Sequence, residues 1–245
     1  PLATTEAECQ RLISAAKNNN VTLLVGHIEQ FNPAVEQMHK ILSDTSKICS
    51  LTAQRMSAAS GRITDVDVSM DLMIHDVEVI QSLVKSPVVN VQASAVKTPS
   101  SPKGKDYITA LVEFENGVTA NIPASRITQA RVRTLSVTTD TNYIDMDFIN
   151  QSINVHTQGR MPYVNQEEIP EWMHYGLKGS VEQLFIPTNQ PLQAELNHFL
   201  NCVRGKETPR ITGESALNAL RVIWNIQEKL GFFAQDNNAL SIAAE

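Results

Sequence analysis

The sequence lacks a long apolar run and a cluster of basic residues, and each absence removes a class of protein. No apolar run approaches the roughly 18 to 20 residues that a membrane-spanning helix needs, so we expect no membrane protein. The 20 Lys and Arg are outnumbered by 26 Asp and Glu, which gives a net charge of −6. Nucleic-acid binding requires a concentrated basic surface, so a nucleic-acid partner is excluded.

Cysteine, glycine and proline are also scarce. The three cysteines, Cys9, Cys49 and Cys202, are far apart and odd in number, which predicts free thiols in a reducing compartment and hence a cytoplasmic protein. With 10 Gly, 11 Pro and 42% hydrophobic residues, the composition excludes collagen-like, disordered and disulfide-scaffold proteins. The 245 residues suffice for one large domain, or for one domain and part of another.

The first part of the chain alternates helix and strand. A Thr-Thr-Glu start predicts a helix from Thr4 that ends in Asn18-Asn19-Asn20. The apolar run 21–26 that follows is typical of a strand buried on both faces. Pro33 begins a second helix, and a strand is expected over 48–56.

After a helix over 69–84, the pattern changes to short β-branched segments with alternating polarity. Six such segments without intervening helices predict an antiparallel sheet. We expect an ordered excursion or lid over 158–179 and a further strand over 181–187. Two amphipathic helices, 191–204 and 213–230, are expected to cover the sheet with their apolar faces. The six segments are 88–96, 107–115, 118–127, 133–139, 143–148 and 152–157.

The helix over 69–84 contains the most informative pair of polar residues. Asp71 and His75 are four apart, so on an α-helix they share one face and can meet the same substrate atom. A histidine exchanges protons near neutral pH, and a carboxylate can orient it. General acid–base catalysis requires groups of this kind. An internal ion pair without catalytic role is the structural alternative. A metal site that recruits Asp76 or Glu78 is a less favoured alternative, because no other His or Cys cluster in the sequence has the spacing of metal ligands.

A second candidate site is the loop after the strand over 21–26. In open α/β sheets, ligands bind outside the carboxyl ends of the strands. The polar residues His27, Gln30 and Asn32 are therefore placed to face a pocket. The alternative is an ordinary loop in which Asn32-Pro33 starts a helix.

Taken together, these segments resemble the glucose-fructose oxidoreductase, inositol dehydrogenase and MocA (Gfo/Idh/MocA) family over residues 1–231. The resemblance rests on the order and spacing of five motifs. They are Pro1-Leu2-Ala3-Thr4-Thr5, Val25-Gly26-His27-Ile28-Glu29-Gln30-Phe31-Asn32-Pro33, Asp71-Leu72-Met73-Ile74-His75-Asp76, Phe114-Glu115-Asn116-Gly117 and Ala124-Ser125-Arg126. The residue sequences of these motifs are similar to those of family members that oxidise a ring hydroxyl of nucleotide-linked amino sugars such as UDP-N-acetylglucosamine.

The resemblance implies a fold and a division into domains. The fold is α/β (α+β): a remnant of a Rossmann domain, then a large open, mainly antiparallel sheet covered by helices on one face. Residues 1–26 are expected to be the end of the NAD(P)-binding domain, 27–233 the substrate-binding and oligomerisation domain, and 234–245 a loose tail. A homodimer or homotetramer through the open sheet face is expected.

The resemblance also implies an activity, NAD(P)-dependent oxidation of a CH–OH group on a sugar or nucleotide sugar. His75 is expected to take the hydroxyl proton and Asp71 to hold the sugar. Further substrate contacts are expected from Arg55, Glu78 and Arg126, cofactor contacts from Pro1, His27, Gln30 and Asn32, and no metal. Pro1 matches the proline of a Glu-Lys-Pro motif, whose lysine would be the preceding residue.

Two positions depart from the family pattern. Gln30 stands where close relatives carry an arginine, and glutamine cannot supply that charge or its forked donors. Glu78 stands where many members have Asp. Because the dinucleotide fingerprint is absent from the sequence, the alternative function is a non-catalytic substrate-binding or dimerisation module.

Overall fold

The computed structural model describes residues 1–42, 47–58, 66–99, 101–158 and 179–232. Most of the predicted lid over 158–179 and the predicted tail over 234–245 lie outside these residues. The described elements are α1 Glu6–Asn18, η1 Ile28–Phe31, α2 Pro33–Leu42, β1 Ile48–Met56, η2 Ser69–Met73, α3 Ile74–Val84, β2 Val88–Ala95, β3 Tyr107–Phe114, β4 Thr119–Ser125, β5 Val132–Thr139, β6 Asn142–Asp147, β7 Ser152–Gln158, β8 Gly179–Leu184, α4 Pro191–Val203 and α5 Gly213–Lys229.

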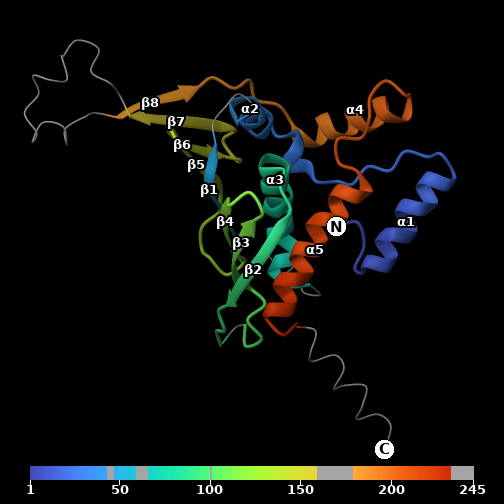
Figure 1. The fold of residues 1–245 in the computed structure, drawn as a ribbon, viewed down its shortest axis with the longest axis horizontal. Helices are drawn as coiled ribbons and strands as arrows, with labels where there is room; N and C mark the ends of the chain where they lie inside the picture. Colours follow the sequence, from blue (N-terminus) through green and yellow to red (C-terminus); the bar gives the residue numbers. More distant parts are fainter. Residues whose placement is uncertain (43–46, 59–65, 100, 159–178, 233–245) are drawn as a thin grey trace, which may run out of the picture.

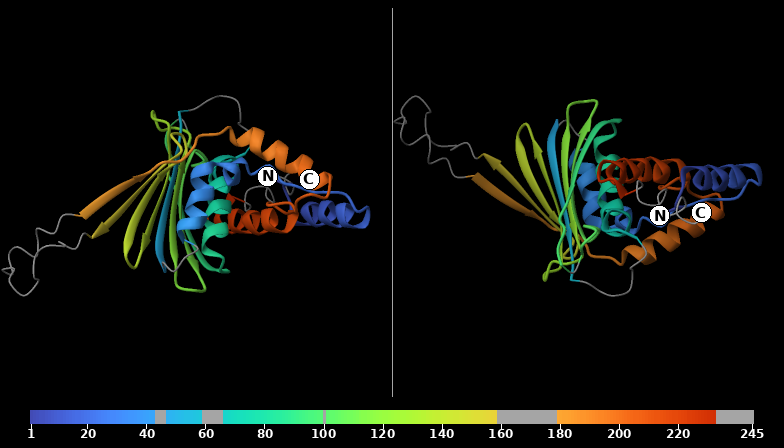
Figure 2. Two further views of the ribbon diagram at one scale, coloured as in Figure 1. Left: turned by 90° about the horizontal axis from the view of Figure 1, so that it is seen from above. Right: turned by 90° about the horizontal axis from the view of Figure 1, so that it is seen from below.

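An eight-stranded sheet forms one layer of the molecule and the helices form the other. Its strand order is β2-β3-β4-β1-β5-β6-β7-β8. All neighbouring strands are antiparallel except β1 and β4, which pair in parallel. The helices lie on one face of the sheet, and the opposite face carries no helix (Figures 1 and 2). The predicted fold class, a mainly antiparallel open sheet covered on one face, is therefore confirmed.

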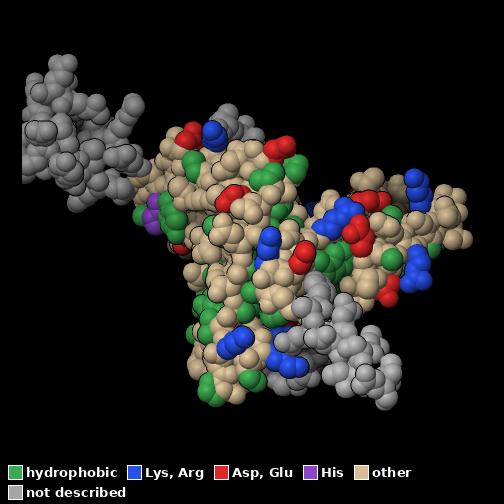
Figure 3. All heavy atoms as spheres, turned by 60° about the horizontal axis from the view of Figure 1, so that its bottom comes forward, with side chains coloured by type: hydrophobic (Ala, Val, Ile, Leu, Met, Phe, Trp, Pro, Cys, Tyr) green, Lys and Arg blue, Asp and Glu red, His purple; other side chains and the backbone are tan. Residues whose placement is uncertain are grey.

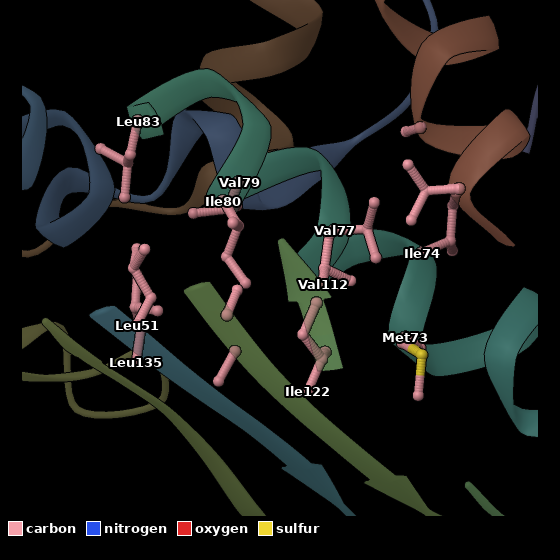
Figure 4. Packing of buried hydrophobic residues seen from close by; sticks show 14 of the residues in the cluster. Leu51, Met73, Ile74, Val77, Val79, Ile80, Leu83, Val112, Ile122 and Leu135 are labelled. Carbon is pink, nitrogen blue, oxygen red and sulfur yellow. The ribbon is translucent and has the colours of Figure 1, made fainter. Parts of the chain in front are cut away.

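The core lies between the sheet and α3. Side chains of Leu51 on β1 and Ile122 on β4 point toward Val77 and Ile80 on the helix, and all four are at most 2% exposed. Figure 4 shows the two sets of side chains meeting between the layers. Because α3 packs directly on the sheet, its polar residues are fixed in position by this core.

The helical run that carries Asp71 and His75 begins with a π-helical turn rather than an α-helical one. Just before this run, Asp67 Oδ1 accepts a hydrogen bond from the Ser69 backbone N at 2.8 Å. Asp67 Oδ2 accepts a bond of 2.6 Å from Gln227 Nε2 on α5. The π-turn Ser69–Met73 then passes into α3 at Ile74. The α-helical register assumed for this pair was wrong, and π-turns of this kind often lie at functional sites.

Two other local predictions were wrong. Residues 21–26 are not a strand, because no strand among the described residues pairs with them and only Val25 N bonds across, to Ile211 O at 3.3 Å. On α4, the apolar face was expected to cover the sheet, but Leu192 and Leu196 are 55% and 54% exposed while Glu195 is 7% exposed. The helix packs on η1 instead of on the sheet.

The surface carries charges of both signs. On the face shown in Figure 3, Lys and Arg side chains are interspersed with Asp and Glu. None of the helices that the structure describes is long and apolar enough to span a bilayer.

Candidate functional site

Two buried histidines from distant motifs meet beside α3. His27 precedes η1 and His75 lies in the first turn of α3, and their rings stand edge to face with centroids 5.9 Å apart. His27 is 2% exposed and His75 is partly buried. Both ring nitrogens of His27 and Nδ1 of His75 are buried without a hydrogen-bond partner among the described residues. Unpaired buried polar atoms are rare in folded proteins, so these three nitrogens mark a place for a ligand or water.

Both imidazoles are held in their neutral form. Burial lowers the pKa of His27 to about 4. Burial and the nearby Arg55 charge lower the pKa of His75 to about 3. Pro1 lies near the pair, close enough for a charge at its nitrogen to act on both rings. A neutral imidazole has a free lone pair and can accept a proton.

A buried ion-pair network supports the site from the sheet side. Arg55 on β1 binds Asp76 through Nε at 3.0 Å and Nη2 at 2.8 Å, and Glu29 through Nη1 at 2.9 Å. Arg55 is 2% exposed. Burial lowers the pKa of its guanidinium, but Asp76 and Glu29 outweigh burial and raise it. Since all three nitrogens are already bonded, the geometry gives Arg55 a structural role that ties β1, η1 and α3 together.

Asn32 holds the loop between η1 and α2. Its Oδ1 accepts a bond from Ala34 N at 3.1 Å, which caps α2. Its Nδ2 donates to Phe148 O at 3.0 Å and to Glu29 Oε2 at 3.3 Å. Asn32 is 1% exposed, so both ends of its amide are occupied by the protein itself.

The two residues that depart from the family pattern bind each other. Gln30 Nε2 donates to Glu78 Oε2 at 2.8 Å, and the two residues are 4% and 6% exposed. Burial raises the pKa of Glu78 to about 7, although the bond from Gln30 acts in the opposite direction. Arg210 Nη1 bonds the Gln30 carbonyl oxygen at 2.7 Å. An amide and a carboxyl group therefore form a pair at a position where the resemblance implied an arginine.

Asp71 is held by Arg126 on the side of the site nearest β4. Arg126 Nη1 lies 3.8 Å from Asp71 Oδ2, and both side chains are less than a fifth exposed. Arg126 Nε also bonds Asp106 Oδ1. A positively charged partner at this distance orients the carboxylate of Asp71.

A cavity of about 1110 Å³ opens next to this site. Gln30 and Glu78 form one of its walls, and α2, α3 and α5 supply the others. His27, His75, Asp71 and Arg126 do not line it. Its volume is close to the upper end of the range of small-molecule sites.

The structure brings the two sequence motifs together. His75, Glu78, His27, Gln30, Asn32 and Arg55 converge through the contacts above, while Asp71 and Arg126 form a second pair at the π-turn. Sequence analysis missed Arg210 and Glu195, which come from the carboxyl-terminal part of the chain. The sequence signal for Glu195 was its position between Leu192 and Leu196 on an amphipathic helix. No group of three His, Cys, Asp or Glu side chains in the described part of the chain is arranged to hold a metal ion.

Comparison with known proteins relates this chain to sugar oxidoreductases. Residues 53–144 match the GFO/IDH/MocA C-terminal domain. This range includes Arg55, Asp71, His75, Glu78 and Arg126. The chain is 25% identical over 240 residues to UDP-N-acetylglucosamine 3-dehydrogenase from Acidithiobacillus ferrooxidans, covering 96% of this chain and 71% of the relative.

Solved structures show the same fold. UDP-N-acetylglucosamine 3-dehydrogenase GnnA from Acidithiobacillus ferrooxidans superposes with a TM-score of 0.79 at 25% identity, over 94% of this chain and 69% of that one. A 3-ketoreductase from Actinomadura kijaniata, solved with NADP and TDP-benzene, superposes with a TM-score of 0.72 at 16% identity, over 93% of this chain and 67% of that one.

Proposed function

We propose that this chain is the substrate half of an NAD(P)-dependent sugar oxidoreductase, because residues 53–144 match the GFO/IDH/MocA C-terminal domain. It acts on a CH–OH group of a sugar or nucleotide sugar. The observation that carries the proposal is the neutral imidazole of His75, whose buried Nδ1 has no partner among the described residues. A proton acceptor of this kind is what oxidation of a hydroxyl group requires.

In this function, His75 takes the proton of the substrate hydroxyl. Burial keeps its ring neutral at physiological pH, so the acceptor lone pair is present before substrate binds. Asp71, held by Arg126, accepts a hydrogen bond from a neighbouring sugar hydroxyl and fixes the ring. Glu78 and Gln30 border the same substrate from the cavity wall. A nucleotide amino sugar such as UDP-N-acetylglucosamine is the substrate favoured by the 25% identical relative.

The residues present fit the nicotinamide end of the cofactor. A carboxamide has donors and an acceptor, which matches the two unpartnered ring nitrogens of His27. Pro1 lies near this pair, whereas Gln30 and Asn32 already bind protein groups and position the loop. When bound, the nicotinamide supplies the acceptor for the hydride that leaves the substrate carbon. The sequence has no Gly-rich phosphate loop, so His27 and Pro1 serve only that end of the cofactor.

The alternative function, a non-catalytic binding or dimerisation module, is favoured by the same lack of a phosphate loop. Titration of the native protein that contains this chain with NAD(P)H separates the two. Saturable binding supports the oxidoreductase, and its absence supports the module. The free thiols of Cys9, Cys49 and Cys202 are consistent with the cytoplasmic location that we propose.

Replacement of His75 tests the catalytic role directly. We expect His75→Ala in the native protein to lower the turnover of UDP-N-acetylglucosamine oxidation by about 100-fold, which is the usual contribution of a general base. Cofactor affinity, measured by NAD(P)H fluorescence, should stay near that of the unsubstituted protein. His156→Asn is the matched control, because His156 is 40% exposed on β7. Unchanged turnover of His75→Ala contradicts the assignment.

A further inference from the structure

One carboxyl group outside the motifs shares the unusual state of the two histidines. Within the described ranges, four buried side-chain polar atoms have no hydrogen-bond partner. Three belong to His27 and His75, and the fourth is Oε1 of Glu195 on α4. Orphaned buried atoms are rare, so their restriction to these three residues requires a common explanation.

Glu195 lies against the loop that carries His27. A Cβ placed on Gly26 would be 3.4 Å from Glu195 Oε1, so the carboxyl group sits against the backbone of the residue before His27. The helix α4 packs on η1, which follows the same loop. Ala194, next to Glu195, packs against a small apolar cluster that contains Val25. Glu195 thus lies against the backbone of the His27 loop, on a helix that packs on η1.

The burial of Glu195 runs against the pattern of its own helix. Leu192 and Leu196 are more than half exposed on α4, whereas Glu195 is 7% exposed. Burial raises the pKa of its carboxyl group. A buried polar group without a partner destabilises the protein, so this arrangement lowers the stability of the ligand-free protein. A ligand that donates hydrogen bonds would remove the penalty.

We propose that Glu195 is a further ligand-binding residue of the site and accepts hydrogen bonds from a pair of neighbouring hydroxyl groups. This inference rests on the proposed function, in which two ligands carry such a pair, the ribose of the nicotinamide cofactor and the ring of the sugar. A carboxyl group has two acceptor oxygens and binds two adjacent hydroxyls well. Hydroxyl donors also suit His27, the residue after Gly26, which is neutral and has acceptor capacity.

The test compares ligand-free and ligand-bound stability of the native protein that contains this chain. Thermal unfolding is measured alone, with NAD, with NADP, and with UDP-N-acetylglucosamine, for the unsubstituted protein, Glu195→Gln and Glu195→Leu. We expect Glu195→Leu to raise the Tm of the ligand-free protein, because it removes the orphaned carboxyl. We expect both variants to bind one ligand about 10- to 100-fold more weakly, as for loss of a hydrogen bond to a charged group. Glu228→Gln, an exposed acid on α5, is the matched control and should change neither.

Each outcome decides the inference. Weaker binding of NAD or NADP alone assigns Glu195 to the cofactor, and weaker binding of UDP-N-acetylglucosamine alone assigns it to the nucleotide sugar. Unchanged binding of both ligands by both variants overturns the inference while the proposed function stands. A lower Tm of ligand-free Glu195→Leu also overturns it, because the carboxyl would then stabilise the fold. If the unsubstituted protein is stabilised by none of the ligands, the proposed function fails and the inference fails with it.

Discussion

His75 and Glu78 lie one turn apart on α3, and burial moves their pKa values in opposite directions. The pKa of His75 falls to about 3 and that of Glu78 rises to about 7. In both cases burial disfavours the charged form, since a low-dielectric environment penalises charge of either sign. The result is a helix that carries two neutral titratable groups near pH 6, while Arg55 forms ion pairs with Glu29 and Asp76.

Glu78 makes the stability of the protein depend on pH. Its folded pKa of about 7 lies above its ordinary value of 4.5, so the folded state binds the extra proton and loses stability as pH rises from 4.5 through 7. The loss reaches about 3 kcal/mol at pH 8, from 1.36 kcal/mol per pKa unit. Glu78→Gln keeps an acceptor for Gln30 and removes the titration. We therefore expect it to gain up to about 3 kcal/mol over the unsubstituted protein between pH 4.5 and pH 8.

Urea unfolding at a series of pH values measures this difference. His27 and His75 have lowered pKa values, so their contribution to stability is lost as pH falls below 6.5. This dependence is opposite to that of Glu78, whose contribution is lost as pH rises. The contribution of the two histidines is common to both proteins and cancels in the comparison. A stability difference that does not change with pH would show that Glu78 is ionised throughout and would contradict the shift.

At the scale of elements, local patterning predicted the sheet strands well. Along β3, buried residues alternate with less buried ones as the polarity pattern predicts, whereas the last four residues of β4 are all buried. Asn116-Gly117 forms the turn between β3 and β4, with Gly117 at φ +85°. The insertion of β1 between β4 and β5 was not predictable. Strand order depends on long-range pairing, which no local pattern encodes.

The failures of prediction have separate physical causes. Residues 21–26 have the composition of a buried strand, but a strand also needs a neighbour to pair with. The Asp71–His75 spacing was correct in sequence, yet the π-turn changes the angular relation that an α-helix would give. The roles of Asn32 and Arg55 depend on Phe148 and Asp76, which are distant in sequence, so only the folded structure shows that their polar atoms are occupied.

The start of α5 depends on a close approach to α1. A Cβ on Gly213 would lie 2.5 Å from Ile13 Cγ1 and 3.0 Å from Leu23 Cδ2. We expect Gly213→Ala to destabilise the protein by about 1 to 3 kcal/mol, as overpacking of a close contact does. Denaturant unfolding measures the loss.

The double variant Gly213→Ala with Ile13→Ala serves as the control. Removing the Ile13 side chain makes room for the new methyl group, so the two changes should be non-additive, with the double variant more stable than the sum of the single effects. Additive effects would show that the two helices do not approach each other as described.

At the scale of the whole molecule, the two faces of the sheet differ. The helices and the candidate site lie on one face, whereas the other is open (Figure 2). On the open face, Tyr143, His156 and Val181 form a row across β6, β7 and β8. Leu111 on β3 is 38% exposed and Tyr143 is 44% exposed. An open antiparallel sheet with apolar side chains is suited to bind the same face of a second copy.

Charged substitutions on this face test the homodimer or homotetramer that the sequence predicts. We expect Leu111→Lys with Tyr143→Lys to reduce the mass of the assembly measured by size-exclusion chromatography with light scattering, because a symmetric interface brings like charges together and buries them. Leu192→Lys on α4, where Leu192 is 55% exposed on the helical side, should leave the mass unchanged. A monomeric unsubstituted protein, or equal dissociation by the α4 variant, would show that the open face is not the interface.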